Sequence, residues 1–301
     1  MKAIITGASG FLGTHLANRL LSENIELFSL GNNQTHRFNH YPVGNGLDKR
    51  MIDACISRVR PDFIFHLAGT TKQECLMHSF NVNAFFALKI LQSLEDHNLD
   101  TKTTNVLIGS AAEYGMVNEG DLPITESKIL NPIDLYGHSK SAQSKISLSW
   151  SNEKRKLMIL RPFNIIGPNM PKHLALGNFV NQISTFGPDG GQLKTGNLDT
   201  RRDFIDVRDA TEIIWRLSQN RQAYGEIVNL CTGKSTPLSK LLEKLIENSG
   251  KKVIIETMKN LKRKNDMQDH YGDNDKLISL LNGYRFRDWE ESINYISQYD
   301  E

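Results

Sequence analysis

The fold is decided by Thr6-Gly7-Ala8-Ser9-Gly10-Phe11-Leu12-Gly13, which follows an apolar run at residues 2–6 and opens a helical pattern that continues to about residue 22. A strand, a glycine-rich turn and a helix in this order are the context in which such a fingerprint binds a dinucleotide. Gly7 permits the tight turn, Gly10 lets the backbone approach a pyrophosphate, and Gly13 lets helix and strand pack closely. The helix would then offer unpaired N–H groups to the phosphates. The alternative is a purely structural turn; we expect a cofactor site formed by Gly7, Ser9, Gly10, Phe11, Leu12 and Gly13.

Apolar runs alternate with helical patterns through the first half of the chain. Strands are expected at residues 2–6, 25–30, 63–69, 105–109 and 157–160, and helices at 77–97 and 135–151. This alternation predicts an α/β fold with a Rossmann-type, doubly wound parallel sheet and ligands at the carboxyl ends of its strands. After Gly167 the regularity loosens. We expect a dinucleotide-binding domain at 1–165 and a smaller mixed α/β substrate-binding region at 166–301, with about 204–235 returning to the first domain through a strand at 225–230.

Composition excludes several classes of protein. The 301 residues carry 36 basic and 34 acidic side chains, so the net charge of +2 predicts neither a nucleic-acid partner nor binding to an anionic membrane. Three widely spaced cysteines form no metal-ligand pattern, and we expect reduced thiols and no metal site. No apolar run approaches the ~20 residues that cross a bilayer, and the first strand begins too early for a signal peptide. A soluble, cytoplasmic protein is expected.

The end of the second expected strand bears on the choice of cofactor. Gly31-Asn32-Asn33 stands where NAD-preferring sites carry a carboxylate for the ribose 2′-hydroxyl. Without that charge a 2′-phosphate is not repelled, and Asn32 or Arg37 could hydrogen-bond it, although Arg37 could equally be a solvated loop residue. We therefore expect NADP(H) in preference to NAD(H). The third strand ends in Leu67, Ala68 and Gly69, which are expected beneath the cofactor, whereas His66 is expected to fill a core position.

Tyr136 and Lys140 lie four residues apart in Tyr136-Gly137-His138-Ser139-Lys140, so a helix would place them on one face. A phenol with a pKa of about 10 is a poor acid–base group at neutral pH. An ammonium one turn away, beside a positive nicotinamide, is expected to lower that pKa. Ser110, just past an apolar run, could hydrogen-bond the oxygen whose proton Tyr136 handles. The Tyr-x-x-x-Lys spacing occurs by chance in many helices, and the glycine turn at the amino terminus is what favours a catalytic pair.

Further motifs stand in register with these residues. They are Phe65-His66-Leu67-Ala68-Gly69, Arg161-Pro162-Phe163-Asn164, Gly196-Asn197-Leu198, Arg202-Asp203-Phe204-Ile205-Asp206-Val207-Arg208-Asp209 and Asn229-Leu230-Cys231-Thr232-Gly233. With them the chain resembles the extended short-chain dehydrogenase/reductases, and within these the sugar-nucleotide epimerase/dehydratase group. The run from Gly196 to Asp209 is most similar to GDP-4-keto-6-deoxy-mannose reductases.

The resemblance implies roles for the catalytic and cofactor-binding residues. Ser110, Tyr136 and Lys140 would act as a unit, with Lys140 also holding the nicotinamide-ribose hydroxyls. Asn81 matches the family's helix asparagine near the cofactor. Asn45 stands where the family often carries an aspartate that contacts adenine, and an asparagine can still hydrogen-bond a ring edge.

The resemblance also implies contacts to the substrate, a nucleotide-linked sugar, from Ser110, Asn164, Arg202 and Arg263. A guanidinium fork suits a diphosphate. Arg202 could instead form a salt bridge with Asp203 or Asp206, and Arg263 belongs to a basic run at 262–264 that could simply be solvated.

One departure from the family pattern narrows the reaction. Dehydratases of the group place an acid where this chain has Ala112, and elimination of water needs both an acid and a base. On an extended segment, the neighbouring Glu113 would face the opposite side. Dehydration is therefore disfavoured, and the resemblance implies NAD(P)H-dependent reduction of a 4-keto group on a nucleotide-linked, GDP-type 6-deoxy sugar. The alternatives are a 4-epimerase that retains its NAD and a non-catalytic, dinucleotide-binding regulatory protein.

The family usually dimerises through the Tyr-Lys helix and the long helix before it. Here Phe80, Phe85, Leu88, Leu91, Ile146, Leu148 and Trp150 offer apolar surface on those two helices, although some of them must face the sheet. A homodimer is therefore expected.

Overall fold

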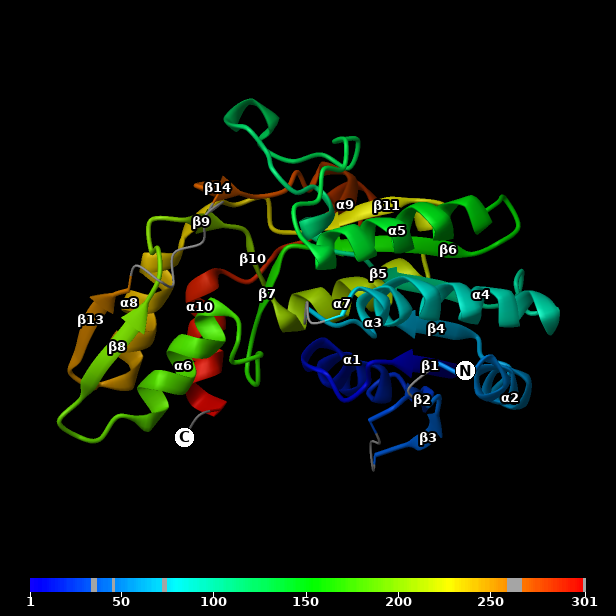
Figure 1. The fold of residues 1–301 in the computed structure, drawn as a ribbon, viewed down its shortest axis with the longest axis horizontal. Coiled ribbons are helices and arrows are strands. Elements are labelled where there is room, and N and C mark those ends of the chain that lie inside the picture. Colours follow the sequence, from blue (N-terminus) through cyan, green and yellow to red (C-terminus); the bar gives the residue numbers. More distant parts are fainter. Residues whose placement is uncertain (34–36, 45–46, 72–74, 259–266, 300–301) are drawn as a thin grey trace.

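A parallel sheet of seven strands forms the centre of the computed structural model, which describes residues 1–301 except 34–36, 45–46, 72–74, 259–266 and 300–301. The strands lie in the order β11-β6-β5-β4-β1-β2-β3 (Figure 1). They are β1 (Lys2–Thr6), β2 (Glu26–Gly31), β3 (Asn39–Pro42), β4 (Phe63–His66), β5 (Thr104–Ile108), β6 (Leu157–Pro162) and β11 (Ile227–Leu230). The predicted Rossmann-type, doubly wound sheet is confirmed; the sequence reading missed β3.

Helices cover both faces of this sheet (Figure 1). On one face, α1 (Phe11–Leu21) packs against α7 (Val207–Ser218); on the other lie α2 (Lys49–Val59), α4 (Phe86–Asp96) and α5 (Leu135–Trp150). Successive side chains of a strand point to opposite faces. Ala3 and Ile5 of β1 accordingly join the core cluster beneath α1, whereas Ile4 joins the cluster beneath α2 and α4. Burial on both sides explains why residues 3–5 of β1 are all apolar.

The helix expected at 77–97 has an interruption. It consists of α3 (Leu76–Phe80), a π-helical turn (Asn81–Phe85) and α4. Of the side chains expected at a dimer surface, Leu91 instead lies in the core between α4 and the sheet, at 1% exposure. Phe85 and Ile146 are exposed.

A second group of elements lies beside the sheet, to the left in Figure 1. Its helices α6 (Ala175–Thr185), α8 (Leu238–Ser249) and α10 (Trp289–Tyr299) share a core with β8 (Gly191–Thr195), which pairs with β13 (Val253–Thr257). Smaller pairings join β7 (Asn164–Ile166) to β10 (Phe204–Asp206), and β9 (Arg201–Arg202) to β12 (Thr236–Pro237) and β14 (Asp269–His270). The last short helix, α9 (Asp275–Leu280), contacts β11.

The chain returns to the sheet between these elements, since α7 packs on α1 and β11 pairs with β6. The domain boundaries at residues 165 and 166 stay a prediction. Among the described residues, no helix combines the length and the apolar character needed to span a membrane.

The predicted site residues lie at the carboxyl ends of the strands. The glycine turn follows β1, residues 67–69 follow β4, and Ser110 follows β5. Strand order changes direction between β1 and β4, and ligands of open α/β sheets bind in the crevice at such a switch point.

Candidate active site

The glycine turn after β1 has the geometry that phosphate binding needs. Gly7 has φ +69°, and a Cβ there would stand 2.8 Å from the Ala68 nitrogen. A Cβ at Gly13 would stand 2.1 Å from the Gly7 oxygen, so helix and turn approach too closely for any side chain. No side chain of the described residues caps α1 at Gly10. The first N–H groups of a helix have no partner within the helix and can bind an anion, and Ser9 and Gly10 beside them are exposed.

The loop after β4 closes one side of this turn. The Ala68 N–H donates to Thr6 Oγ1 over 3.1 Å, and Leu67 and Ala68 are half-buried while Gly69 is exposed. His66 fills a core position, as expected, with Nδ1 2.9 Å from the same Thr6 hydroxyl. Burial, with a smaller contribution from the charge of Lys140, lowers the pKa of His66 to about 3, so the ring is neutral.

Ser110 begins a tight turn rather than an extended segment. Residues Ala111–Glu113 form a 3₁₀ helix, and Ser110 Oγ accepts the Ala112 N–H at 3.1 Å. The expectation that Glu113 faces the opposite side of an extended strand is therefore wrong. The turn folds its carboxylate back, so that Oε1 accepts the Ser110 N–H at 2.9 Å and Oε2 accepts Arg161 Nε at 3.0 Å.

The Tyr-Lys pair lies on α5, whose first turn is capped by Asp134 accepting the Gly137 N–H at 2.8 Å. Lys140 is 3% exposed and its Nζ donates to Gln143 Oε1 at 2.5 Å. Burial lowers the pKa of Lys140 to about 8, against the opposing effect of Glu113.

Tyr136 differs from expectation in the direction of its pKa. Burial raises it, and a hydrogen bond with the Ser110 side chain acts in the opposite direction. The expectation that Lys140 lowers the pKa of Tyr136 is therefore wrong for this structure: burial raises the pKa of the phenol, and burial also lowers the pKa of Lys140, which disfavours its charged ammonium. The phenol is thus protonated at neutral pH, in the state that can donate a proton to substrate.

Sequence reasoning missed Asn83, which ties α5 to the loop after β4. Its Nδ2 donates to Ser139 Oγ at 2.8 Å and to the Thr70 oxygen at 2.9 Å, and its Oδ1 accepts the Thr70 N–H at 2.7 Å. Ser139 Oγ in turn donates to the backbone carbonyl oxygen of Tyr136 at 2.8 Å. Asn83 is fully buried, whereas Asn81, the asparagine singled out from the sequence, is half-buried on the π-helical turn. Asn83 therefore holds the turn of helix that carries Tyr136.

The other predicted binding residues lie at the rim. Asn32 is exposed at the end of β2, and Arg37 donates to Asn18 Oδ1 of α1 at 2.5 Å. Asn164 is exposed and its Nδ2 donates to the Asp203 oxygen at 3.0 Å, which brings it beside the strand after Arg202. Asn45 and Arg263 lie outside the described residues.

Arg202 is half-buried, and its NH1 donates to the backbone oxygens of Arg201 and Met267. The carboxylates of its two suggested salt-bridge partners have other donors. Asp203 accepts from Thr232 and Gly233, and Asp206 accepts from Arg208.

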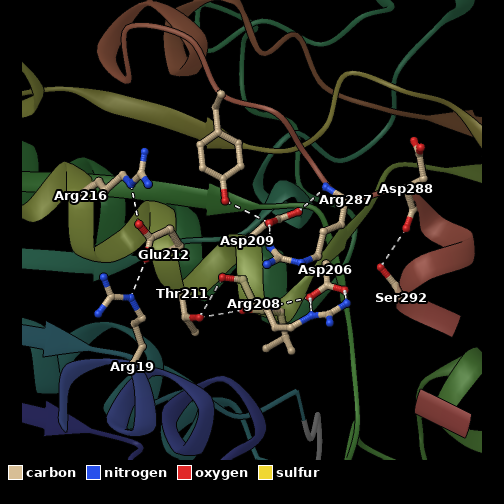
Figure 2. Close-up of polar contacts among 12 residues, drawn as sticks. Arg19, Asp206, Arg208, Asp209, Thr211, Glu212, Arg216, Arg287, Asp288 and Ser292 are labelled. Carbon is tan, nitrogen blue, oxygen red and sulfur yellow. Dashed lines mark hydrogen bonds and ion pairs between the residues drawn. The ribbon is translucent and has the colours of Figure 1, made fainter. Parts of the chain in front are cut away.

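A cavity of about 910 Å³ lies elsewhere, between α1, α7 and the segment 283–295. Four of its five arginines are paired with carboxylates. Figure 2 shows Arg19 and Arg216 on either side of Glu212, and Arg208 beside Asp206; Arg287 pairs with Asp209. We refer to this cavity as the arginine groove. It joins the C-terminal segment to α7, and none of the predicted site residues lines it.

Comparisons with known proteins agree with this geometry. The model of the NAD dependent epimerase/dehydratase family matches residues 3–231. The chain is 29% identical over 255 residues to the GDP-6-deoxy-D-mannose reductase of Pseudomonas aeruginosa, covering 82% of this chain and 79% of that protein. It is 29% identical over 295 residues to the GDP-6-deoxy-D-talose 4-dehydrogenase of Aggregatibacter actinomycetemcomitans, and the match covers 95% of this chain and 93% of that protein. The solved structure of RMD from Pseudomonas aeruginosa complexed with NADPH superposes with a TM-score of 0.84 at 25% identity, over 100% of this chain and 98% of that one.

Proposed function

Because this chain belongs to the NAD dependent epimerase/dehydratase family, we propose that it is a 4-ketoreductase that uses a nicotinamide dinucleotide to reduce a GDP-linked 4-keto-6-deoxy sugar. Two relatives named for GDP-6-deoxy sugars support this substrate class. The observation that carries the reaction type is the arrangement of Ser110, Tyr136 and Lys140, together with the engagement of the buried Glu113 carboxylate by the Ser110 N–H and by Arg161.

In this reaction a bound NADPH supplies the hydride to the keto carbon. Ser110 Oγ accepts the Ala112 N–H, so its own O–H acts as a donor; it bonds to Tyr136 in the structure and would turn to the keto oxygen of a bound substrate. The protonated Tyr136 donates its proton as the oxygen becomes an alcohol. Lys140 holds the ribose hydroxyls and stabilises the phenolate that remains. Placement of these donors around the developing oxyanion would provide much of the rate.

Dehydration is disfavoured on physical grounds. Elimination of water needs an acid for the leaving hydroxyl and a base for the C–H bond. Ala112 can be neither. Glu113 is 0% exposed, and its two oxygens accept from the Ser110 N–H and from Arg161. A carboxylate so engaged does not exchange protons with a sugar.

We propose NADP(H) as the preferred cofactor. No carboxylate follows β2 at Gly31-Asn32-Asn33, and Arg37 is held against α1 by Asn18. Introducing the missing charge tests this assignment: N32D is expected to weaken NADPH binding about tenfold and to leave NADH binding nearly unchanged. Equal weakening of both cofactors in fluorescence titrations would contradict it.

We also propose a homodimer that packs α4 and α5 against their mates. Phe85, on the π-helical turn just before α4, and Ile146, on α5, expose apolar surface that a symmetric contact would bury. Light scattering of the wild type should give twice the mass of one chain. The F85E/I146E variant should give the mass of a single chain. A monomeric wild type would remove the proposal.

The reaction is tested by mixing purified enzyme with NADPH and GDP-4-keto-6-deoxymannose and following the cofactor. A reductase consumes one NADPH for each sugar reduced. A 4-epimerase with retained NAD interconverts sugars without net consumption, and a regulatory protein binds the cofactor without turnover. Either of these two results would replace the proposal.

A further inference from the structure

Glu113 and Arg161 form a buried ion pair directly beneath the Ser110 turn. Their side chains are 0% and 2% exposed, and the carboxylate accepts from both Nε and NH2 of the guanidinium at 3.0 Å. Arg161 NH1 also donates to the Tyr114 hydroxyl at 3.2 Å, which in turn donates to Asn229 Oδ1 at 2.6 Å. The pair thereby links the Ser110 turn to β6 and β11. A buried charge is retained only when it is paired and hydrogen-bonded, as both are here.

This pair fixes the backbone on which Ser110 stands. The carboxylate reaches the Ser110 N–H only because residue 109 is glycine: a Cβ there would stand 2.4 Å from Glu113 Oε1. Ser110 Oγ accepts the Ala112 N–H, and the Glu113 side chain accepts the Ser110 N–H, so each end of the turn holds the other. This reciprocal bonding locks the direction in which the Ser110 hydroxyl points.

Burial raises the pKa of Glu113, and the charge of Arg161 opposes this rise; paired with Arg161, the Glu113 carboxylate places negative charge next to the two titrating groups of the site. Around Lys140 stand Tyr136 on its own helix, neutral His66 on β4, and Glu113 with Arg161 behind it. Around Tyr136 stand Ser110, Glu113 and Asp134. The Glu113 charge raises the pKa of Lys140 and of Tyr136. Its removal should therefore lower both.

We propose that Glu113, held by Arg161, is a positioning residue that orients the Ser110 hydroxyl and keeps a compensating negative charge beneath Tyr136 and Lys140. The role in turnover rests on the function proposed above for these three residues. Glu113 itself does not touch substrate, since it is fully buried.

Two substitutions separate the charge from the geometry. E113Q keeps the reach of the side chain and loses the charge, whereas E113D keeps the charge and loses one methylene of reach. E113Q/R161M removes both charges and serves if E113Q alone does not fold. D209N is the matched control, because Asp209 is an equally buried carboxylate paired with an arginine in the arginine groove.

The first measurement does not depend on turnover. Lysine labelled with ¹³C at Cε reports each ammonium by NMR, and Lys140 is assigned by the resonance that K140R removes. We expect a midpoint near pH 8 in wild type, a fall on the order of 0.5 pH unit in E113Q, and a smaller fall in E113Q/R161M, from which the opposing charge of Arg161 is also removed. E113D should shift the midpoint by less than half as much as E113Q, and D209N should leave it unchanged.

The second measurement is NADPH-dependent reduction of the keto sugar. E113D should lower kcat on the order of tenfold, with KM and NADPH affinity nearly unchanged, because a misplaced Ser110 affects the transition state. An unchanged Lys140 midpoint in both E113Q and E113Q/R161M, or wild-type kcat in E113D, overturns the inference. Absence of turnover in wild type, with the Lys140 midpoint shifted as expected, overturns the proposed reaction and leaves the charge role of Glu113 standing.

Discussion

The carboxyl edge of the sheet and the arginine groove are both rich in charge, yet their charges are arranged differently. In the groove, Glu212 pairs with Arg19 and Arg216, and the hydrogen bonds from these arginines outweigh burial and lower its pKa. At the carboxyl edge, Lys140 has the neutral Gln143 as its hydrogen-bond partner, and burial lowers its pKa to about 8. Four of the five arginines of the groove are paired with carboxylates, whereas Lys140 at the carboxyl edge has a neutral hydrogen-bond partner and a pKa at which it can gain or lose its proton.

Under the proposed function, the size of a cavity does not locate the chemistry. The groove has a volume of about 910 Å³, but its paired charges fit a structural role in holding the segment 283–288 to α7. Perturbed titrating groups that converge at strand ends are the better indication of an active site. Four predictions test the contrast, from the largest expected effect to the smallest.

Y136F should abolish reduction at the carboxyl edge. Loss of the proton donor is expected to lower kcat about 10³-fold, within the range for general acids, while NADPH binding stays within about twofold. The control is K145M, which replaces an exposed lysine on the same helix and should keep wild-type kcat. Steady-state kinetics measure kcat, and fluorescence titration measures NADPH binding. Wild-type turnover by Y136F would contradict the assignment of Tyr136 as the proton donor.

K140M should change how stability depends on pH. Below pH 8 both folded and unfolded wild type hold the Lys140 proton, and burying that ammonium costs stability. Between pH 8 and 10.5 the folded protein releases the proton while the unfolded chain still binds it, so wild type gains up to about 3 kcal/mol relative to K140M. Urea unfolding without cofactor measures this difference. Parallel pH profiles for the two proteins would show that the lysine is not perturbed.

D209N should affect stability and leave the chemistry intact. Asp209 is buried and accepts from the Arg287 N–H and the Tyr284 hydroxyl as well as from the Arg287 guanidinium. Breaking this pair is expected to cost about 2–3 kcal/mol, less than for a fully buried pair because Arg287 is 39% exposed. Urea unfolding measures the loss. A large fall in kcat of the folded variant would mean that the groove does take part in catalysis.

R216M should leave the stability and the kcat of the protein almost unchanged. Its guanidinium is 51% exposed and Glu212 keeps Arg19 as a partner. Exposed pairs contribute about 0.5 kcal/mol, so stability and kcat should both stay near wild type. A loss of several kcal/mol in the free energy of unfolding would contradict the view that Arg19 is a sufficient partner for Glu212.

Much of the fold was predictable because its signals are local. β1, the glycine turn and α1 follow from an apolar run and three glycines at fixed spacing. β3 was missed because Asn39–Pro42 has no apolar run, and its pairing with β2 depends on tertiary context. Asn83 could have been predicted as a buried, hydrogen-bonded residue. It shares the buried helical face of Ala87 and Ile90, where a polar side chain needs a hydrogen-bond partner.

The Glu113–Arg161 pair was less accessible from the sequence. Arg161 ends an apolar strand, and a charge at that position indicates a buried counter-ion, but nothing local says which carboxylate supplies it. The answer depends on the 3₁₀ turn after Ser110, which brings Glu113 back toward β6 across 48 residues of sequence. The pKa of Tyr136 was misjudged for a related reason, since burial is a property of the packed site rather than of helical spacing.

Transfer of labelled hydride tests the central claim most directly. NADPH carrying deuterium at the transferable position would be mixed with GDP-4-keto-6-deoxymannose and enzyme, and the product analysed by NMR and mass spectrometry. We predict one deuterium at C4 of the sugar for each cofactor oxidised, and none with Y136F over the same time. A sugar product without deuterium, or one formed while the cofactor stays reduced, would contradict the account.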